Sequence, residues 1–203
     1  MHLRCFELAR DALNSQGFCV IGGYMSAVND AYKKKGLISA KHRIAMCHLA
    51  CKSSDFVMVD PWEASQITYQ RSLTVLSRIK TSLLDSGLAS SDSLKVMLLC
   101  GSDLLESLST PGVWIPEQVS SFSRFFKKKK VHLAGFVLTH HHTNPICYFK
   151  KYKANTCCVL TFQVRTICRD FGLVCIRRDC QDVENIIAKD DILNSYKVRK
   201  RIC

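Results

Sequence analysis

Side chains that could do chemistry gather in one basic stretch, residues 119–163, which has no acidic residue. It contains the lysine run Lys127–Lys130, the three histidines His140–His142, and the adjacent Cys157 and Cys158. His140–His142 together with Cys147 could bind a metal, but adjacent histidines need a rigid scaffold before they can form a closed tetrahedral site. Lysines interleaved with aromatic rings are typical of segments that bind nucleic acid, and a lysine run can also act as a nuclear localisation signal. The third interpretation, which we favour, is a flexible or poorly packed insertion, so we expect no metal site.

The net charge of +12 is concentrated rather than spread along the chain. Residues 119–163 carry +8 and the tail 198–203 carries +3, so the remaining residues carry only +1. The basic character therefore belongs to two segments and not to the body of the chain.

The composition is that of a folded protein. The chain has 203 residues, 47% hydrophobic and 23% charged, which is room for one domain, or one and a half, with a true core. No apolar run approaches the ~18 residues that a membrane span needs. The first twenty residues carry charges throughout and lack the apolar segment of a signal peptide. We therefore expect no membrane partner, reduced cysteines, and a cytoplasmic or nuclear location.

Hydrophobic spacing predicts strands that alternate with helices. Helices are expected over residues 3–14, 39–52, 68–84 and 182–189. Buried strands are expected over residues 18–21, 56–59, 96–100 and 173–176. The polar stretch 24–36 is read as a loop. In the helix at 39–52, the side chains expected to face the core are Ile44, Met46, Cys47, Leu49 and Ala50.

Alternating strands and helices predict an α/β fold with a parallel sheet that is covered on both faces. In such folds ligands bind beyond the carboxyl ends of the strands. A site is therefore expected in the segments that follow the predicted strands, which are residues 24–36, 60–69, 101–114 and 177–182.

Five motifs along the chain, in order, carry a family resemblance. They are MHLRCFELARDAL, NDAYKKKGLISAKHR, FVMVDPWEASQITYQRSLTVL, KVMLLCGSDLLESL and TPGVWIPEQ, and similarity resumes at VRTICRDFGLVCIRRDCQDVENII. Together they resemble the nicotinamide/nicotinate mononucleotide adenylyltransferases of the eukaryotic type. The resemblance covers residues 1–118 and 164–197, and it implies that these stretches form one nucleotidyltransferase domain with a Rossmann-like, three-layer fold.

The resemblance also implies a reaction. Enzymes of this family transfer the adenylyl group of ATP to nicotinamide or nicotinate mononucleotide, which yields NAD or its deamido form and pyrophosphate. The 5′-phosphate of the mononucleotide attacks the α-phosphorus of ATP, so the protein must hold two anions in line and neutralise their charge. Mg²⁺ on the ATP phosphates is the expected cofactor. Self-association into a homo-oligomer is left open.

Matched residue by residue, the resemblance implies an ATP-binding set. His2 matches a histidine that contacts ATP phosphate, and Lys34 matches a lysine that contacts phosphate and nucleotide; these two are the implied catalytic residues. Gly101 and Asp103 match the turn on the adenosine side, where glycine lets the backbone approach the nucleotide and a carboxylate can accept hydrogen bonds from ribose. Taken alone, a lysine run is more often a solvated loop, and Gly-Ser-Asp an ordinary turn.

A second set matches the pocket for the pyridine ring. Trp62 and Tyr69 match its lining, and Tyr69 stands where the family commonly has a tryptophan; either ring can stack on nicotinamide. Ser72 matches a position that contacts the pyridine substituent. Val113 and Trp114 match the second wall of the pocket. Taken alone, an isolated tryptophan is more often a core residue.

The chain also departs from the family. The family places a central strand and a glycine-serine-phenylalanine-asparagine-proline turn before the point that matches Met1, so we expect a strand and part of the phosphate cradle to be missing. Helices carrying a serine-serine-threonine-arginine motif are expected to be missing after Lys197. Residues 119–163 and 198–203 match nothing in the family. Because Val119 and Val198 can have codons that begin with GT, we hypothesise that both segments are translated introns.

The sequence thus predicts an incomplete α/β nucleotidyltransferase domain. The expected function is adenylyl transfer in NAD synthesis, with very weak or no activity in the chain as written. Two alternatives stay open, which are a catalytically inactive isoform that joins family oligomers and a nucleic-acid-binding module built on the basic insertion. Of these partners, nucleic acid is the one we expect least.

Overall fold

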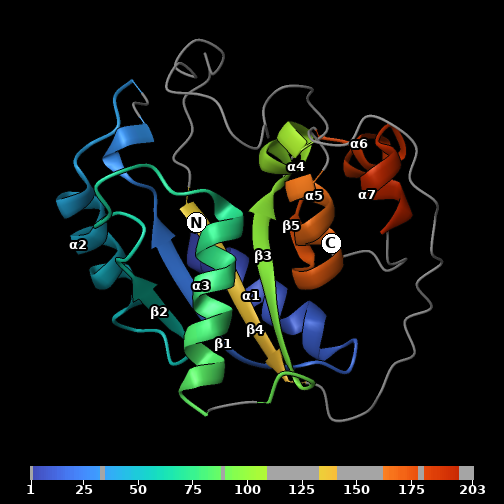
Figure 1. Ribbon diagram of the computed structural model, residues 1–203, viewed down its shortest axis with the longest axis horizontal. Helices are drawn as coiled ribbons and strands as arrows, with labels where there is room; N and C mark the ends of the chain where they lie inside the picture. The colour runs from blue at the N-terminus through green and yellow to red at the C-terminus, as the bar shows by residue number, and fades with distance from the viewer. Residues whose placement is uncertain are drawn as a thin grey trace.

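The structure is a computed structural model that describes residues 2–32, 35–87, 90–108, 133–140, 162–177 and 181–196. Within these ranges the chain forms a five-stranded sheet with helices on both faces (Figure 1). The α/β class and the covered parallel strands predicted from the sequence are confirmed.

The sheet has the strand order β2-β1-β4-β3-β5. β1 (Cys19–Ala27) pairs in parallel with β2 (Val57–Asp60), and β3 (Leu94–Gly101) pairs in parallel with β5 (Leu173–Ile176). Between these two pairs lies β4 (Leu133–His140), which is antiparallel to both β1 and β3. The other four strands therefore run in one direction, and their carboxyl ends meet at one edge of the sheet (Figure 1).

β4 comes from the segment that the sequence analysis interpreted as a flexible or poorly packed insertion. It pairs with β1 over its whole length, from Leu133 opposite Ala27 to His140 opposite Cys19, and it also pairs with β3. The interpretation is therefore wrong for residues 133–140. The facing edges of β1 and β3 are both hydrogen-bonded to β4.

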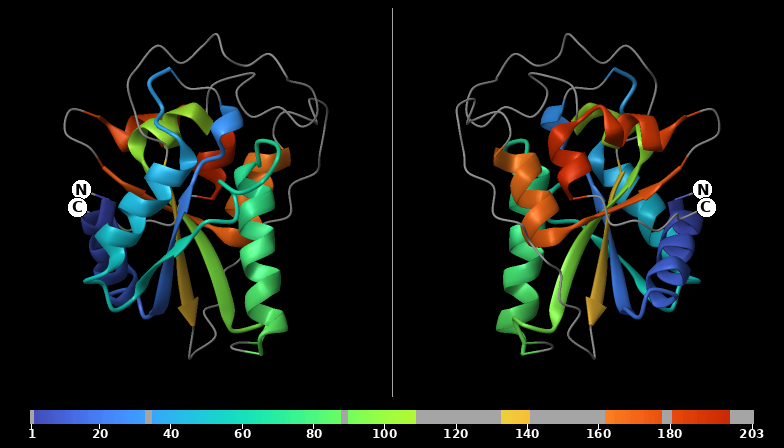
Figure 2. Two further views of the ribbon diagram at one scale, coloured as in Figure 1. Left: turned by 90° about the vertical axis from the view of Figure 1, so that its left-hand side faces the viewer. Right: turned by 90° about the vertical axis from the view of Figure 1, so that its right-hand side faces the viewer.

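The helices form a layer on each face of the sheet (Figure 2). α1 (His2–Asn14) and α2 (Ala40–Cys51) pack on one face, where they share an apolar cluster with β1, β2, β3 and β5. α3 (Ser72–Asp85) and the π-helical turn η2 (Ile167–Phe171) pack on the other face against β3. This is the three-layer arrangement that alternating strands and helices predict.

β3 is buried between the two helical layers. Met97 and Leu99 pack into the cluster beneath α1 and α2, whereas Val96 and Leu98 pack beneath α3. All four side chains are at most 5% exposed. The continuous apolar run of this strand predicts burial on both faces, because successive side chains point to opposite sides of a sheet.

A third apolar cluster joins four short helices beside β5. These helices are α4 (Ser102–Leu108), α5 (Phe162–Thr166), α6 (Val183–Ala188) and α7 (Asp191–Ser195). The buried members of the cluster are Leu105, Leu108, Val164 and Leu193. It fixes the later part of the chain against the helix that follows β3.

Three residues set the turns around β5. Asp182 caps α6, because its carboxylate accepts a hydrogen bond of 3.1 Å from a backbone N–H, and Asp190 caps α7 through bonds of 2.9 and 2.8 Å. Gly172 precedes β5 with a φ of +106°, and a Cβ atom there would lie 3.4 Å from both Lys95 and Met97. Glycine is required at this turn because other residues rarely adopt that backbone angle.

Two elements differ from their predicted limits by more than two residues. β1 continues through Gly22 and Gly23 to Ala27, so residues 24–27, read as loop, belong to the strand. Pairing on both sides holds this stretch in the sheet, although glycine weakens a strand. The long helix predicted from Thr68 starts at Ser72 as α3.

α2 turns a different face to the core from the one expected. Its buried residues are Ala40, Arg43, Cys47 and Cys51. Of the residues predicted to point inward only Cys47 is buried, whereas Met46 is 51% exposed and Leu49 is 74% exposed. The inward position that apolar spacing would give to an aliphatic side chain is taken by Arg43.

We predict that a proline in β4 destabilises the fold. Val137→Pro removes an N–H in the strand between β1 and β3, whereas Val137→Thr keeps the N–H and the branched side chain. A buried backbone partner left unsatisfied costs ~1–3 kcal/mol, so the proline variant should melt about 2–12 °C below the threonine variant. Equal melting temperatures, measured by circular dichroism, would show that β4 does not stabilise the sheet.

Candidate functional site

Several of the predicted ligand-binding residues that the structure describes lie around the carboxyl edge of the sheet. Segment 28–39 follows β1 and segment 61–71 follows β2. Gly101 ends β3, and Asp103 lies in the first turn of α4 directly after it. α1 runs in the direction opposite to β1 (Figure 1). The end of the helix that begins at His2 is therefore the end nearer to this edge of the sheet.

A buried carboxylate joins the end of β1 to the segment after β2. Glu63, only 6% exposed, accepts a hydrogen bond of 2.8 Å from Ser26 Oγ in β1. Asn29 Nδ2 donates to the backbone carbonyls of Glu63 at 3.2 Å and of Gln66 at 2.6 Å. Ser26, Asn29 and Glu63 are called the latch below, because these bonds fold segment 61–71 over the end of β1.

The environment of Glu63 favours its neutral form. Burial raises the pKa of this carboxyl group from its ordinary 4.5 to about 7, and the charge of Asp60 adds to the rise. The hydrogen bond from Ser26 and the charge of Arg43 act in the opposite direction. The latch therefore contains a group that changes its charge close to neutral pH.

Two tyrosine rings stack beside the latch. Tyr32, from the short helical turn η1 (Asp30–Tyr32), lies with its ring centroid 5.6 Å from that of Tyr69 and with an interplanar angle of 28°. Burial of the phenol group, with smaller effects of Glu63 and Tyr32, raises the pKa of Tyr69 to about 12, although 44% of the residue is exposed. Tyr69 is therefore uncharged at neutral pH, and Tyr32 occupies one face of its ring.

Trp62 is held by the end of β2. Its backbone N–H donates to Asp60 Oδ1 at 3.2 Å, and its carbonyl accepts from Gln66 Nε2 at 3.0 Å. The guanidinium carbon of Arg78, on α3, lies 4.9 Å from the centre of the indole ring. Arg78 also forms an ion pair with Asp60.

A buried arginine fixes the loop that follows β1. Arg43, 5% exposed, donates from Nε to the carbonyl of Ile38 at 2.7 Å and from Nη1 to the carbonyl of Val28 at 2.6 Å. Its Nη2 donates to Asp30 Oδ1 at 2.5 Å. The N–H of Ala40, and then Arg43, lower the pKa of the Asp30 carboxyl group. One side chain of α2 therefore holds both ends of this loop.

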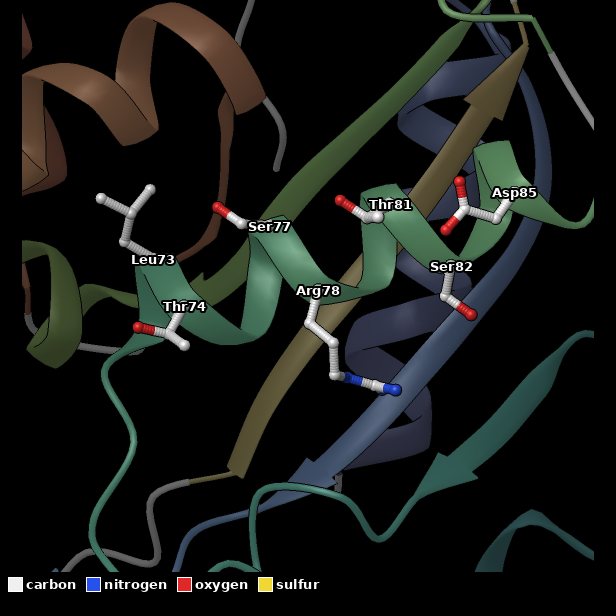
Figure 3. Close-up of a pocket in the computed structure, with 7 residues that line it drawn as sticks. All are labelled: Leu73, Thr74, Ser77, Arg78, Thr81, Ser82 and Asp85. Carbon is white, nitrogen blue, oxygen red and sulfur yellow. The ribbon is translucent and has the colours of Figure 1, made fainter.

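An open cavity of about 740 Å³ runs along the outer side of α3 (Figure 3). In the described part of the chain it is lined by residues between Leu73 and Asp85, mostly hydroxyl side chains, together with Arg78. None of the predicted site residues that the structure describes lines this cavity. Arg78 connects it to Trp62.

The structure brings several predicted site residues to the sheet edge. Trp62 and Tyr69 lie in the one segment that the latch holds, and Ser72 begins α3 directly after it. Gly101 and Asp103 lie on the neighbouring half of the sheet, at the junction of β3 and α4. Their placement suits a ligand that spans the edge, and their contacts with ligand stay predictions.

Other predicted residues cannot be placed in this way. Lys34, Val113 and Trp114 lie outside the residues that the structure describes. His2 is described by its backbone alone, as the first residue of α1.

Sequence reasoning did not single out three residues that organise the site. Glu63 holds segment 61–71, and Arg43 holds the loop after β1. Arg78 lies over the indole ring of Trp62. Glu63 could have been found as an ionisable residue directly after a predicted buried strand. Arg43 interrupts the apolar spacing of a helix, but this signal does not show whether the arginine faces inward.

Three features of the described ranges concern metals, membranes and disulfides. They hold no group of three or more His, Cys, Asp or Glu residues that could bind a metal ion. No helix within them is long and apolar enough to cross a membrane. The seven cysteines in these ranges are free thiols.

We predict that Glu63 makes stability depend on pH. Because its pKa is about 7 in the fold and 4.5 ordinarily, the folded protein binds this proton more tightly than the unfolded chain does. The stabilisation that comes from this tighter proton binding is complete below pH 4.5 and is lost as the pH rises to about 7. Glu63→Gln keeps an acceptor for Ser26 but cannot titrate.

The measurement is urea denaturation of both proteins across this range. The free energy of unfolding of the wild type, relative to that of Glu63→Gln, should fall by up to about 3 kcal/mol as the pH rises. Parallel curves for the two proteins would contradict the prediction.

We predict that Arg43 contributes more to stability than its ion pair alone. Arg43→Lys keeps a charge but leaves buried carbonyl groups without donors, which should cost about 2 kcal/mol. Asp30→Asn keeps an acceptor and removes only the partly exposed ion pair, which should cost less than about 1 kcal/mol. The two losses are compared by urea denaturation, and equal losses would show that the carbonyl contacts of Arg43 contribute nothing.

Known proteins similar to this chain share one name. The nicotinamide/nicotinic acid mononucleotide adenylyltransferase of Arabidopsis thaliana is 55% identical over 194 residues, which cover 96% of this chain and 63% of the relative. The protein of the same name from Oryza sativa is 52% identical over 197 residues, covering 97% of this chain and 61% of the relative. Nicotinamide/nicotinic acid mononucleotide adenylyltransferase 1 of Bos taurus is 31% identical over 228 residues, which cover 95% of this chain and 65% of the relative. The chain thus spans less than two thirds of each of these relatives.

The family resemblance predicted from the five motifs is confirmed by these similarities. A model of the cytidylyltransferase-like family matches residues 1–198, which include all the described elements. The chain therefore belongs to the cytidylyltransferase-like family of nucleotidyltransferases, and within it resembles the nicotinamide/nicotinic acid mononucleotide adenylyltransferases.

Proposed function

We propose that this chain binds nicotinamide or nicotinate mononucleotide at the carboxyl edge of its sheet, and that its reaction is adenylyl transfer from ATP to form a dinucleotide. The observation that carries the proposal is the latch, which holds the segment bearing Trp62 and Tyr69 at the edge where α/β folds bind ligands. The similarity to enzymes named for this reaction supports it.

The proposed chemistry needs no covalent intermediate with the protein. An oxygen of the mononucleotide 5′-phosphate forms a bond to the α-phosphorus of ATP, and the bond from that phosphorus to the β-phosphate oxygen breaks. Pyrophosphate leaves with the electron pair. Catalysis then consists of holding the two phosphates in line and neutralising the negative charge that builds up.

The pyridine side of the ligand is assigned to the segment after β2. In this proposal Trp62 and Tyr69 stack on the pyridine ring, and Ser72 contacts its carboxamide or carboxylate substituent. Val113 and Trp114 form the second wall of the pocket. An uncharged Tyr69, whose pKa is raised to about 12, keeps a neutral ring beside the ligand at physiological pH.

The ATP side is assigned to the other half of the edge. Gly101 would let the backbone approach the adenosine, and Asp103 would accept hydrogen bonds from ribose hydroxyl groups. Lys34 and His2 would contact the phosphates. ATP would enter as its Mg²⁺ complex, with the metal held on the phosphate oxygens and neutralising part of their charge.

Three further parts of the proposal concern the whole protein. We propose a cytoplasmic or nuclear location, which the free thiols of the described cysteines suit. Self-association is a separate proposal. The division into a family domain of residues 1–118 and 164–197, with residues 119–163 as an addition to it, also stays a prediction.

The proposal is tested by calorimetric titration of the full chain with each mononucleotide. Base–aromatic stacking contributes ~1–3 kcal/mol, so Trp62→Leu should weaken binding by roughly 5- to 150-fold. Ile67→Ala is the matched control, because Ile67 lies in the same segment and is 99% exposed. A coupled assay for the dinucleotide measures turnover, which we expect to be very weak. Absence of mononucleotide binding to the wild type would overturn the proposed function.

A further inference from the structure

The contact between Arg78 and Trp62 is not part of the predicted ligand-binding set. The guanidinium group lies over the indole ring, with its central carbon 4.9 Å from the ring centre. A cation placed over the face of tryptophan is attracted by the ring, and the planar guanidinium can also stack on it. The contact joins α3 to the segment that carries the predicted stacking rings.

Asp60 holds both members of this contact. Its carboxylate is 8% exposed, forms an ion pair with Arg78, and accepts a hydrogen bond of 3.2 Å from the backbone N–H of Trp62. One carboxylate at the end of β2 therefore binds the backbone of Trp62 and also holds the Arg78 guanidinium group over the indole ring.

The remaining contacts of Arg78 do not give it another partner of this kind. Its Nε atom is buried and has no hydrogen-bond partner in the described part of the chain. Figure 3 shows the side chain leaving α3 on the side opposite the hydroxyl groups of Ser77 and Thr81. The ion pair and the indole ring are thus what orient the guanidinium.

We propose that Arg78 is a positioning residue for mononucleotide binding. It covers one face of Trp62 and fixes the indole plane, so that the opposite face is presented to the pyridine ring. The inference rests on the proposed function, because it concerns how the stacking ring of that site is held. In this role Arg78 orients the indole ring and does not contact the ligand. The affinities for nicotinamide and nicotinate mononucleotide should therefore depend on Arg78 equally.

The test compares three variants of the full chain by calorimetric titration with each mononucleotide. Arg78→Met removes the ion pair and the stacking contact, whereas Arg78→Lys keeps a charge for Asp60 but has no planar group. Lys80→Met is the control, because Lys80 makes a similar contact on α3, 5.5 Å from the ring of Phe171 and away from Trp62.

Both Arg78 variants should raise the Kd for both mononucleotides by roughly 3- to 30-fold, and Lys80→Met should leave it within about twofold. Arg78→Lys should keep a denaturation midpoint near that of the wild type. In the free protein, acrylamide should quench tryptophan fluorescence more strongly in Arg78→Lys than in the wild type, because one face of Trp62 becomes accessible.

Wild-type affinity in Arg78→Lys would overturn the inference, since the ion pair would then be sufficient. An equal loss in Lys80→Met would also overturn it, because the effect would belong to α3 as a whole. If the variants lost more affinity for one mononucleotide than for the other, Arg78 would recognise the charge of the ligand directly. That result would also overturn the inference. If the wild type binds neither mononucleotide, the proposed function itself fails, and this inference with it.

Discussion

The hydrogen-bonded ladder of β4 joins the two halves of the sheet. β1 pairs with β2, β3 pairs with β5, and β4 connects β1 to β3. Buried backbone N–H and C=O groups must find partners, so the facing edges of β1 and β3 depend on this strand. The proposed site has the same division, with the latch and Trp62 on one half and Gly101 and Asp103 on the other. The ladder therefore sets the separation between the part of the site assigned to the mononucleotide and the part assigned to ATP.

Buried charged side chains hold the segments on the half of the sheet assigned to the mononucleotide. Arg43 holds the loop after β1 through backbone carbonyls, Glu63 holds segment 61–71 through Ser26, and Asp60 holds Trp62 together with Arg78. Charged groups are seldom buried unless they are paired or hydrogen-bonded, and each of these has such partners. The segments after β1 and β2 thus owe their shape to a few polar contacts rather than to an apolar core.

Local sequence patterns predicted the elements that apolar spacing defines. The strand at 173–176 was predicted with its observed limits, and β3 was predicted from its continuous apolar run. Limits were missed where pairing with a neighbour decides the structure, as where β1 continues through Gly22 and Gly23. β4 was missed because its pairing with β1 and β3, which are distant in the sequence, leaves no signal within residues 133–140 themselves. In the candidate site, motif matching predicted the rings Trp62 and Tyr69, which stay a prediction. The contacts of Glu63 and Arg78 join segments that are distant in the sequence, so no local pattern encodes them.

The position of β4 in the chain has a consequence for biosynthesis. Cys19 pairs with His140, so partners in the centre of the sheet are separated by more than a hundred residues. Such distant pairings form slowly, because a long loop must close before any contact is gained. When the ribosome has released the chain only as far as β3, the edges of β1 and β3 that face β4 have no neighbour yet, and open edges can pair with other chains. The nascent protein therefore passes through a stage in which protection by chaperones matters most, and that stage ends when the fourth strand emerges.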